Sequence, residues 1–309
     1  KPLRGAARRG AARLNSGVRA RMSKLLAVAI ALIFPASGCT EAPQPQERSA
    51  ADRTYIPVTS LRTSHYILHS SASETETKSV SIAVESLYNA YVRLFPPKSP
   101  AAELNLVLYK DQVEFKRHSR ISPWAEAYYK RPYSYAYPGT GENPHHWMLH
   151  EATHQLLAEA GGYRPRRWLN EGIASYFGAS ALLDGSLDLG RPDPAAYPIW
   201  WLKDVRINPN APPTFQERRL PSLEQLVEDT GPPIGENVNH YYIAYWSLVH
   251  YLFHGDNGAH RVAVQALLEQ RGSPQAFKQL VGAYDVVEPR WHAHLADLAS
   301  GQAGIGRGP

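Results

Sequence analysis

Two short segments carry the residues whose types and spacing could perform chemistry. Residues 150–154 read His-Glu-Ala-Thr-His, and residues 168–172 read Trp-Leu-Asn-Glu-Gly, which places Glu171 seventeen positions after His154. On a helix, positions i and i+4 share a face, so His150 and His154 can point both imidazoles at one ion. Glu171 on a second helix can supply a third ligand. Two His and one Glu leave a fourth position open for water, which is typical of a catalytic zinc site.

The flanking sequence predicts the two helices that must position these ligands. The first begins near Pro144 and ends at the stop formed by Gly161 and Gly162, and apolar residues around the histidines indicate that it is buried. The second extends from about residue 166 to 177 or 179. Its apolar neighbours would bury Glu171, and a buried carboxylate needs a partner. A divalent cation is one such partner, and a surface ion pair with a neighbouring arginine is the alternative.

The rest of the chain predicts an α+β fold. Short strands and helices alternate before the metal helix, at 66–69, 75–95, 104–109, 111–118 and, as one or two strands, 125–137. After the helix that carries Glu171, only helices are predicted, at 222–229, 239–254, 259–271, 274–282 and 288–299. This order indicates a small mixed sheet beside the metal helix, followed by an all-helical C-terminal subdomain.

The two ligand segments together resemble the gluzincin branch of the zincin metallopeptidases. Residues 168–177 are similar to the glutamate helix of the aminopeptidase-N-like family. That family has a longer spacing from the second His to the Glu and a Gly-Ala-Met-Glu-Asn motif that this chain lacks, so aminopeptidase activity does not follow. In size and order, residues 65–285 resemble the small bacterial peptidase-MA-like domains, with the specific motifs at 145–177 and 241–253. The resemblance implies a zincin-like fold and zinc-dependent hydrolysis of peptide bonds.

The resemblance also implies roles for individual residues. His150, His154 and Glu171 would bind one Zn²⁺ per chain, and Glu151 would be the general base. Because Glu151 follows His150 by one position, it lies about 100° around the helix, where it can reach the attacking water rather than the ion. It would take a proton from that water and pass it to the leaving amine.

Two further features are expected from the same resemblance. A zincin adds a donor to the oxyanion, and the tyrosine four residues before Trp246 selects Tyr242, with Tyr245 and His240 as alternatives. A zincin also has an edge strand that pairs with the substrate backbone, and residues 131–137 are placed to form it. An ordinary tyrosine-rich hairpin is the alternative for that segment.

The N-terminal segment predicts export and a lipid anchor. Residues 22–24 read Met-Ser-Lys and precede ten apolar residues, 25–34, which are too few for a stable membrane span and typical of a secretory signal. Small residues at 36–38 before Cys39 resemble the lipobox of bacterial lipoproteins, except that alanine replaces the usual leucine. An ordinary signal peptide with an incidental cysteine is the alternative. Because Cys39 is the only cysteine, neither an internal disulfide nor a disulfide-linked partner is expected.

Composition divides the chain into segments of different character. They are interpreted as misassigned upstream translation (1–21), a signal peptide (22–38), a lipid-anchored flexible tether (39–58), a catalytic domain (59–300) with a sheet-containing lobe (59–160) and a helical lobe (161–300), and a tail (301–309). Residues 1–24 hold eight basic and no acidic side chains, and without residues 1–38 the counts are 25 basic and 28 acidic, so the net charge falls from +5 to −3. The basic balance belongs to the leader, and no nucleic-acid partner is expected.

These features predict an exported zinc metallopeptidase of the bacterial cell envelope, whose partners are a peptide or protein substrate and, through the lipid anchor, a membrane. Two alternatives remain open: a zincin-fold envelope binding or scaffold protein without turnover, and a zinc hydrolase of a non-peptide bond. Glu151 favours catalysis, since a binding protein has no need of a general base. His250 and His254 also have i, i+4 spacing, but no third ligand is evident, and they are interpreted as helix residues.

Overall fold

The computed structural model describes residues 55–98, 103–119, 121, 125–139, 144–208 and 211–301. The predicted signal peptide, Cys39 and most of the predicted tether lie outside these residues. All of the described residues fall in one unit, Asp52–Pro309. Of the helices in these ranges, none is both long and apolar enough to cross a membrane.

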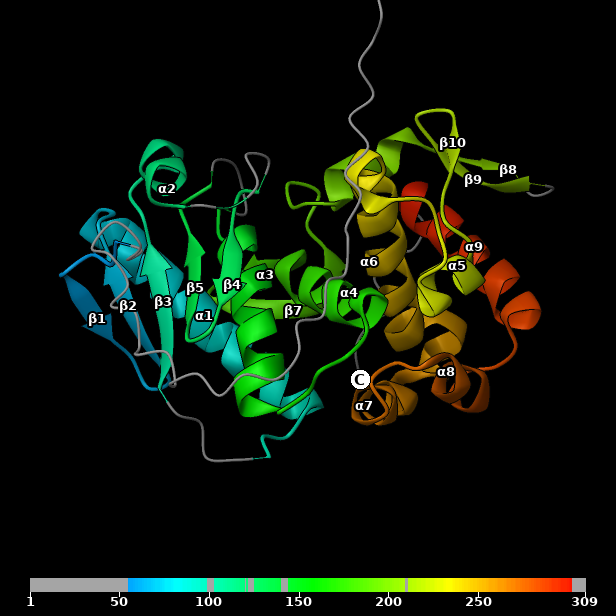
Figure 1. The fold of residues 1–309 in the computed structure, drawn as a ribbon, viewed down its shortest axis with the longest axis horizontal. Coiled ribbons are helices and arrows are strands. Elements are labelled where there is room, and N and C mark those ends of the chain that lie inside the picture. Colours follow the sequence, from blue (N-terminus) through cyan, green and yellow to red (C-terminus); the bar gives the residue numbers. More distant parts are fainter. Residues whose placement is uncertain are drawn as a thin grey trace, which may run out of the picture. The chain divides into compact units, whose positions relative to one another are not determined.

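A five-stranded mixed sheet forms one side of this unit (Figure 1). The strand order is β1-β2-β3-β5-β4. The inner strands β2, β3 and β5 are parallel, whereas β1 and β4 run antiparallel at the two edges. The strands are β1 (Ser60–Arg62), β2 (Tyr66–Ser70), β3 (Leu104–Leu108), β4 (Tyr128–Lys130) and β5 (Tyr133–Ala136). The predicted mixed sheet is therefore confirmed.

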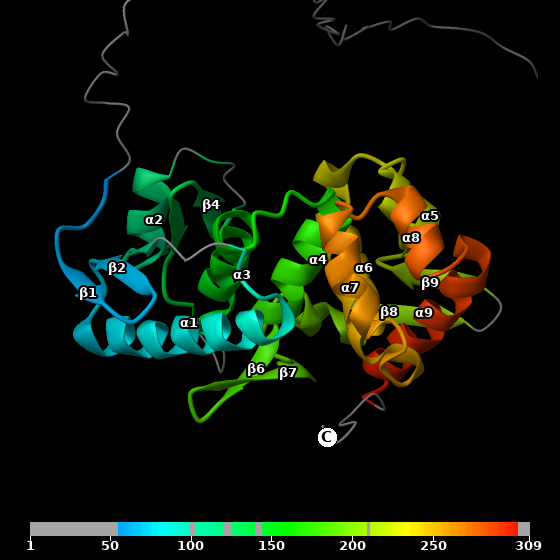
Figure 2. The same ribbon diagram turned by 90° about the horizontal axis from the view of Figure 1, so that it is seen from below.

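Helix α1 (Glu74–Leu94) runs along this sheet and packs against β2 and the helix α3 (His146–Gln155) (Figure 2). Its start is fixed by a capping box, in which Ser73 and Glu76 each accept a hydrogen bond from the other's backbone N–H. Its buried face repeats at helical spacing, at Val80, Val84, Leu87 and Tyr91. The helix ends before two prolines, as the sequence predicts.

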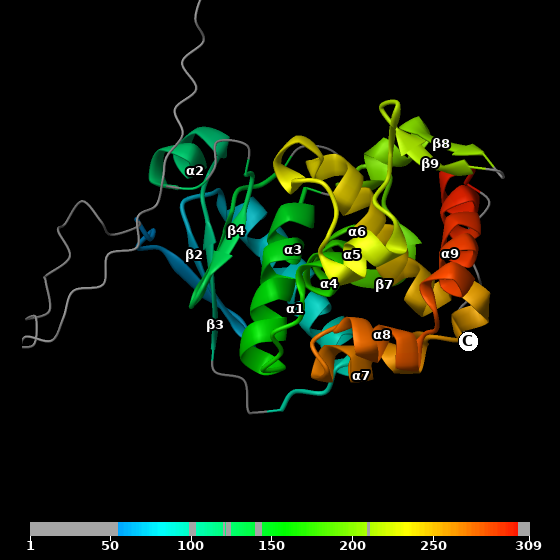
Figure 3. The same ribbon diagram turned by 45° about the vertical axis from the view of Figure 1, so that its right-hand side comes forward.

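Three helices form the centre of the unit. Helix α3 lies between the sheet and helix α4 (Arg167–Gly178), and α4 packs in turn against α6 (Val238–His254) (Figure 3). Most side chains of α6 are buried. Because α3 and α4 lie inside the main hydrophobic core, their relative position is fixed by apolar packing on both sides.

The prediction that only helices follow α4 is wrong. A hairpin of β6 (Ser180–Leu183) and β7 (Ser186–Pro192) lies against α1, and a small sheet is formed by β8 (Val205–Asn208), β9 (Ala211–Phe215) and β10 (Arg218–Arg219). These strands are short, so their apolar alternation is weak. The β6–β7 turn is an Asp-Gly pair with positive φ at both residues, a hairpin signal that the sequence does carry.

The predicted C-terminal helices are all present, although their bounds shift. They are α5 (Leu223–Glu228), α6, α7 (Arg261–Glu269), α8 (Pro274–Leu280) and α9 (Tyr284–Ala299), and α2 (Gln112–His118) is the predicted short helix of the sheet lobe. Short 3-10 helices, η3 (Ile199–Asp204), η4 (Ile234–Glu236) and η5 (Gly255–Gly258), connect the elements. The α+β class is confirmed.

Candidate metal centre

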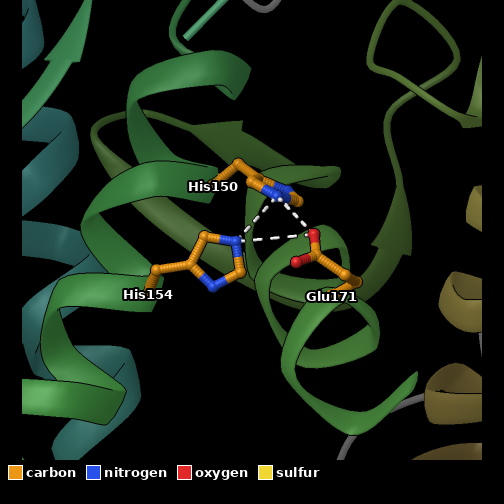
Figure 4. A group of neighbouring side chains, drawn as sticks. All are labelled: His150, His154 and Glu171. Atoms are coloured by element: carbon orange, nitrogen blue, oxygen red, sulfur yellow. Dashed lines mark hydrogen bonds and ion pairs between the residues drawn. The ribbon is translucent and has the colours of Figure 1, made fainter. Parts of the chain in front are cut away.

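The two histidines come from α3 and the glutamate from α4 (Figure 4). After His154 the helix continues for one wide turn, the π-helix η2 (Leu156–Ala160), and Gly162 then adopts a φ of +62° that reverses the chain toward α4. At the far end of α4, Gly178 packs against α3 so closely that a β-carbon there would lie 3.2 Å from the His150 Cβ. The absence of a side chain at Gly178 therefore lets α4 lie directly beside the histidines.

The three predicted ligands converge on one point. The Nε2 atoms of His150 and His154 are 3.1 Å apart, and they lie 3.4 Å and 3.5 Å from Oε2 of Glu171. Four tetrahedral ligands at bond lengths of about 2.0–2.2 Å would hold neighbouring ligand atoms about 3.3–3.6 Å apart. The two edges that end at Glu171 lie within this range, and the edge between the two histidines is about 0.2 Å shorter. These side chains are 11%, 12% and 18% exposed, so the group is buried but reachable from solvent. The residues fit a bound metal ion.

The electrostatics of the group also fit a cation. Burial would lower the pKa of His154, but the negative charge of Glu171 and its hydrogen bond outweigh this and raise the pKa to about 9. Burial would likewise raise the pKa of Glu171, whereas the charge on His154 and hydrogen bonds from both imidazoles hold it well below its usual value. Positive charge is therefore already favoured beside Glu171, and a divalent cation would replace the proton on His154.

Glu151 lies beside this triangle, and its pKa is shifted in the opposite direction from that of Glu171. Burial raises the pKa of the Glu151 carboxyl above its usual value, and the neighbouring His150 and His154 oppose the rise only in part. A backbone hydrogen bond from Tyr129 also reaches this carboxyl. A carboxyl group with a raised pKa that faces a reacting centre is suited to accept and return a proton.

The group opens into a cleft of about 600 Å³. Glu151, Glu171 and the two histidines form part of its lining. The remaining lining residues come from the segment before β4, β4 itself, η2, the loop after η2, α4 and α6: Ile121, Ala125, Ala127, Tyr128, Tyr129, Leu157, Ala158, Tyr163, Arg164, Pro165, Asn170 and Tyr242. The cleft is thus large enough for several residues of an extended chain.

The predicted edge strand is displaced by one strand. Residues 131–137 contain β5, which is hydrogen-bonded on both sides, to β3 and to β4. The edge of the sheet is instead β4, and Tyr128 and Tyr129 of β4 line the cleft. The prediction failed because both segments are tyrosine-rich and alternate, and only the pairing with β3 decides which of them is internal.

Of the three candidate oxyanion donors, only Tyr242 lies at the group. Its hydroxyl donates a 2.9 Å hydrogen bond to Oε2 of Glu171, and it lines the cleft. Tyr245 is buried in the main core and does not line the cleft. His240 is turned away, and its Nε2 lies 2.8 Å from the carbonyl oxygen of Phe215. The helix α6 therefore presents one of its aromatic residues to the ligands and packs the other two elsewhere.

The second pair of histidines has structural partners. Nδ1 of His250 lies 2.8 Å from Nε2 of His294, and Nε2 of His250 lies 3.0 Å from the carbonyl oxygen of Gly190. His254 is hydrogen-bonded to Tyr176. Among the described residues, one group of three or more His, Cys, Asp or Glu side chains could hold a metal ion. It consists of His150, His154 and Glu171.

Two residues of the site had no role in the sequence prediction. Asn170 lines the cleft, and its side-chain amide lies 3.5 Å from Oε1 of Glu171. Its position directly before Glu171 in the sequence could have indicated that it lies near the metal ligands. Tyr129 reaches Glu151 through its backbone and donates its hydroxyl to Glu159 on η2 at 2.8 Å. No local pattern marks it, because its role depends on the pairing of β4 with β5.

A comparison with protein families gives a match over part of the chain. Residues 147–271 match a family described as "Protein of unknown function (DUF1570)". The match begins within α3 and extends through α7, so it includes the three ligands, Glu151 and Tyr242. A comparison with curated proteins gives no match.

Proposed function

We propose that this chain is a zinc-dependent peptidase in which Glu151 is the general base. The observation that carries this proposal is the triangle of His150, His154 and Glu171, whose edges are close to the ligand spacing of a tetrahedral zinc site. Two imidazoles and one carboxylate are also the donor types that zinc accepts, and they leave a further position for water. We further propose that the chain has a zincin-like fold, with β4 as the edge strand beside the metal helix.

When bound, zinc supplies Lewis-acid chemistry, because it lowers the pKa of water towards 7 and polarises a carbonyl group. Glu151 takes the proton of the attacking water and later gives it to the leaving amine, a role that its raised pKa supports. The hydroxyl of Tyr242, which donates to Oε2 of Glu171 in this structure, turns to donate to the substrate oxygen that becomes negatively charged. Backbone groups of β4 that face away from β5 can pair with an extended substrate.

The test combines metal content with turnover. Zinc in the purified full-length chain would be measured by mass spectrometry, and hydrolysis would be followed on a mixed peptide library. Wild type should hold one zinc per chain and cleave peptides, and Glu171→Ala should lose most of the zinc. Glu151→Gln should keep the zinc and lose hydrolysis. Glu224→Gln is the matched control, because Glu224 is an exposed carboxylate on α5 and does not line the cleft.

The outcomes separate the proposed peptidase from its alternatives. Full zinc in Glu171→Ala would remove the third ligand, and undiminished hydrolysis in Glu151→Gln would remove the general base. A zinc-loaded wild type that cleaves no peptide would favour a binding protein of the envelope or a hydrolase of a non-peptide bond. We also propose, on the sequence of residues 22–39 alone, that the chain is exported and anchored to a membrane through a lipid on Cys39.

A further inference from the structure

Arg164 stands out among the side chains of the cleft. Among the described residues that line the cleft, it is the one with a permanent positive charge. It belongs to the loop between η2 and α4, and its side chain is exposed, so it lies at the open side of the cleft. The other ionisable side chains of the lining surround the metal centre or are tyrosines.

The loop that carries Arg164 is held at both ends. On one side, the N–H of Tyr163 donates to the carbonyl oxygen of Leu157 at 2.7 Å, and the Tyr163 side chain is buried. On the other side, the N–H of Arg166 donates to the carbonyl oxygen of Arg271 at 2.8 Å. The backbone of Arg164 is therefore fixed before a substrate arrives, which reduces the entropy lost when its side chain binds a ligand.

Two charged side chains near Arg164, those of Arg167 and Glu159, have partners within the protein. Nη1 of Arg167 lies 3.6 Å from Oδ1 of Asp229, and the carboxylate of Glu159 accepts the hydroxyl of Tyr129. Arg164, by contrast, forms no ion pair with any residue in the described ranges. The positive charge of Arg164 also acts on Tyr129, which lines the cleft. Burial raises the pKa of the Tyr129 hydroxyl, and the charge of Arg164 opposes that rise. Arg164 thus differs from Arg166 and Arg167 in that it lines the cleft, and from Arg167 also in that it has no ion pair within the described residues.

We propose that Arg164 binds a carboxylate of the substrate and makes the cleft selective for peptides that carry one on that side of the reacting bond. This inference rests on the proposed peptidase function. A guanidinium group can hold a carboxylate through two parallel hydrogen bonds. Arg164 is the side chain of the cleft lining whose permanent positive charge can attract such an anionic group. The carboxylate can come from the C-terminus of a peptide or from an Asp or Glu side chain.

The test uses three zinc-binding probes whose affinity does not depend on turnover. They are a dipeptide hydroxamate with a free C-terminal carboxylate, the same compound as its C-terminal amide, and an amide whose last residue is glutamate. Binding to the zinc-loaded full-length chain would be measured by calorimetry, for wild type, Arg164→Gln and the control Arg166→Gln. A hydrogen bond between charged groups predicts a gain of roughly ten- to hundred-fold for a carboxylate probe over the plain amide.

The gain should disappear in Arg164→Gln and persist in Arg166→Gln, while both variants bind the plain amide as wild type does. A gain for the terminal carboxylate alone, or for the glutamate side chain alone, identifies the source and supports the proposal. Equal affinities of all three probes in wild type, a gain that survives in Arg164→Gln, or no binding of any probe would overturn it. Selective binding without peptide cleavage would refute the proposed hydrolysis and leave the role of Arg164 standing.

Discussion

Gly172 should control the position of Glu171, and Gly172→Ala tests this directly. The glycine follows Glu171 on α4 and faces α6. A β-carbon at this position would lie 2.5 Å from Cγ2 of Val249 and 2.8 Å from the carbonyl oxygen of Tyr245. Ordinary contacts of a β-carbon begin at 3.4 Å, so the two helices must separate locally by about 0.6 Å at the backbone oxygen.

The expected cost follows from two opposing effects. Overpacking a filled core destabilises a protein by about 1–3 kcal/mol. Alanine in place of glycine inside a helix returns about 1 kcal/mol. Because one of the two short contacts is to backbone, which cannot rotate away, we expect a net loss of about 1–2 kcal/mol. For a domain of this size, that corresponds to a decrease in Tm of about 2–8 °C.

The same displacement should weaken zinc binding more than it weakens the fold. Glu171 moves with its neighbour, while His150 and His154 stay on α3, so the triangle opens. We expect the zinc affinity to fall at least tenfold, measured by competition with a chromophoric chelator beside thermal unfolding. Gly235→Ala is the control, because a β-carbon there meets no atom within 4 Å, and neither property should change.

A double-mutant cycle with Val249→Ala tests whether the close packing of Gly172 against α6 positions Glu171. Val249→Ala removes the closer of the two contacts, so it should recover at least about 0.5 kcal/mol in the Gly172→Ala background relative to additivity. Strict additivity, or a Gly172→Ala variant with unchanged stability and zinc affinity, would show that the approach of α4 to α6 does not position Glu171.

Three further predictions concern other parts of the chain. Tyr242→Phe should lower kcat by about 10²-fold with full zinc content, whereas Tyr245→Phe should not, and an unchanged kcat in Tyr242→Phe would remove the donor. Burial, together with the nearby His254 and His294, lowers the pKa of His250 to about 3, although a hydrogen bond to Gly190 opposes the shift. Below the unfolded pKa of about 6.5 the unfolded chain therefore binds a proton that the folded chain excludes, so stability should fall by about 2 kcal/mol between pH 7 and pH 5. Guanidinium unfolding at both pH values, with a flatter dependence in His250→Asn, checks this, and a parallel dependence in the variant would contradict it. Cys39→Ser should release the exported chain from membranes in fractionation, and continued sedimentation with membranes would exclude the lipid anchor.

Local signals made the metal helices predictable. The spacing of the histidines, the double-glycine stop and the apolar face around Glu171 each act within one turn or one helix, and α3 and α4 lie where those signals place them. The choice between Tyr242 and Tyr245 was different, because it depends on how α6 is rotated about its axis. The close approach of Gly172 to the Tyr245 backbone sets that rotation, and no residue pattern within α6 reports it.

The errors involve contacts between distant residues. Whether 128–130 or 133–136 forms the edge depends on which strand binds β3, and both have the composition of a strand. The hairpin at 180–192 was not predicted, although the Asp-Gly pair at its turn is a known hairpin signal. The β9–β10 turn was less accessible, because Gln216 and Glu217 occupy positive φ, which such residues rarely adopt.

The short connection between α3 and α4 has a consequence for the order of assembly. All three ligands lie within 22 residues of chain, from His150 to Glu171, whereas Tyr242 joins Glu171 from 71 residues further along. Closing a loop this short costs little chain entropy, and such contacts form early in folding. We therefore expect metal capture to precede the docking of α6, so that the centre gains its ligands first and its hydroxyl donor last.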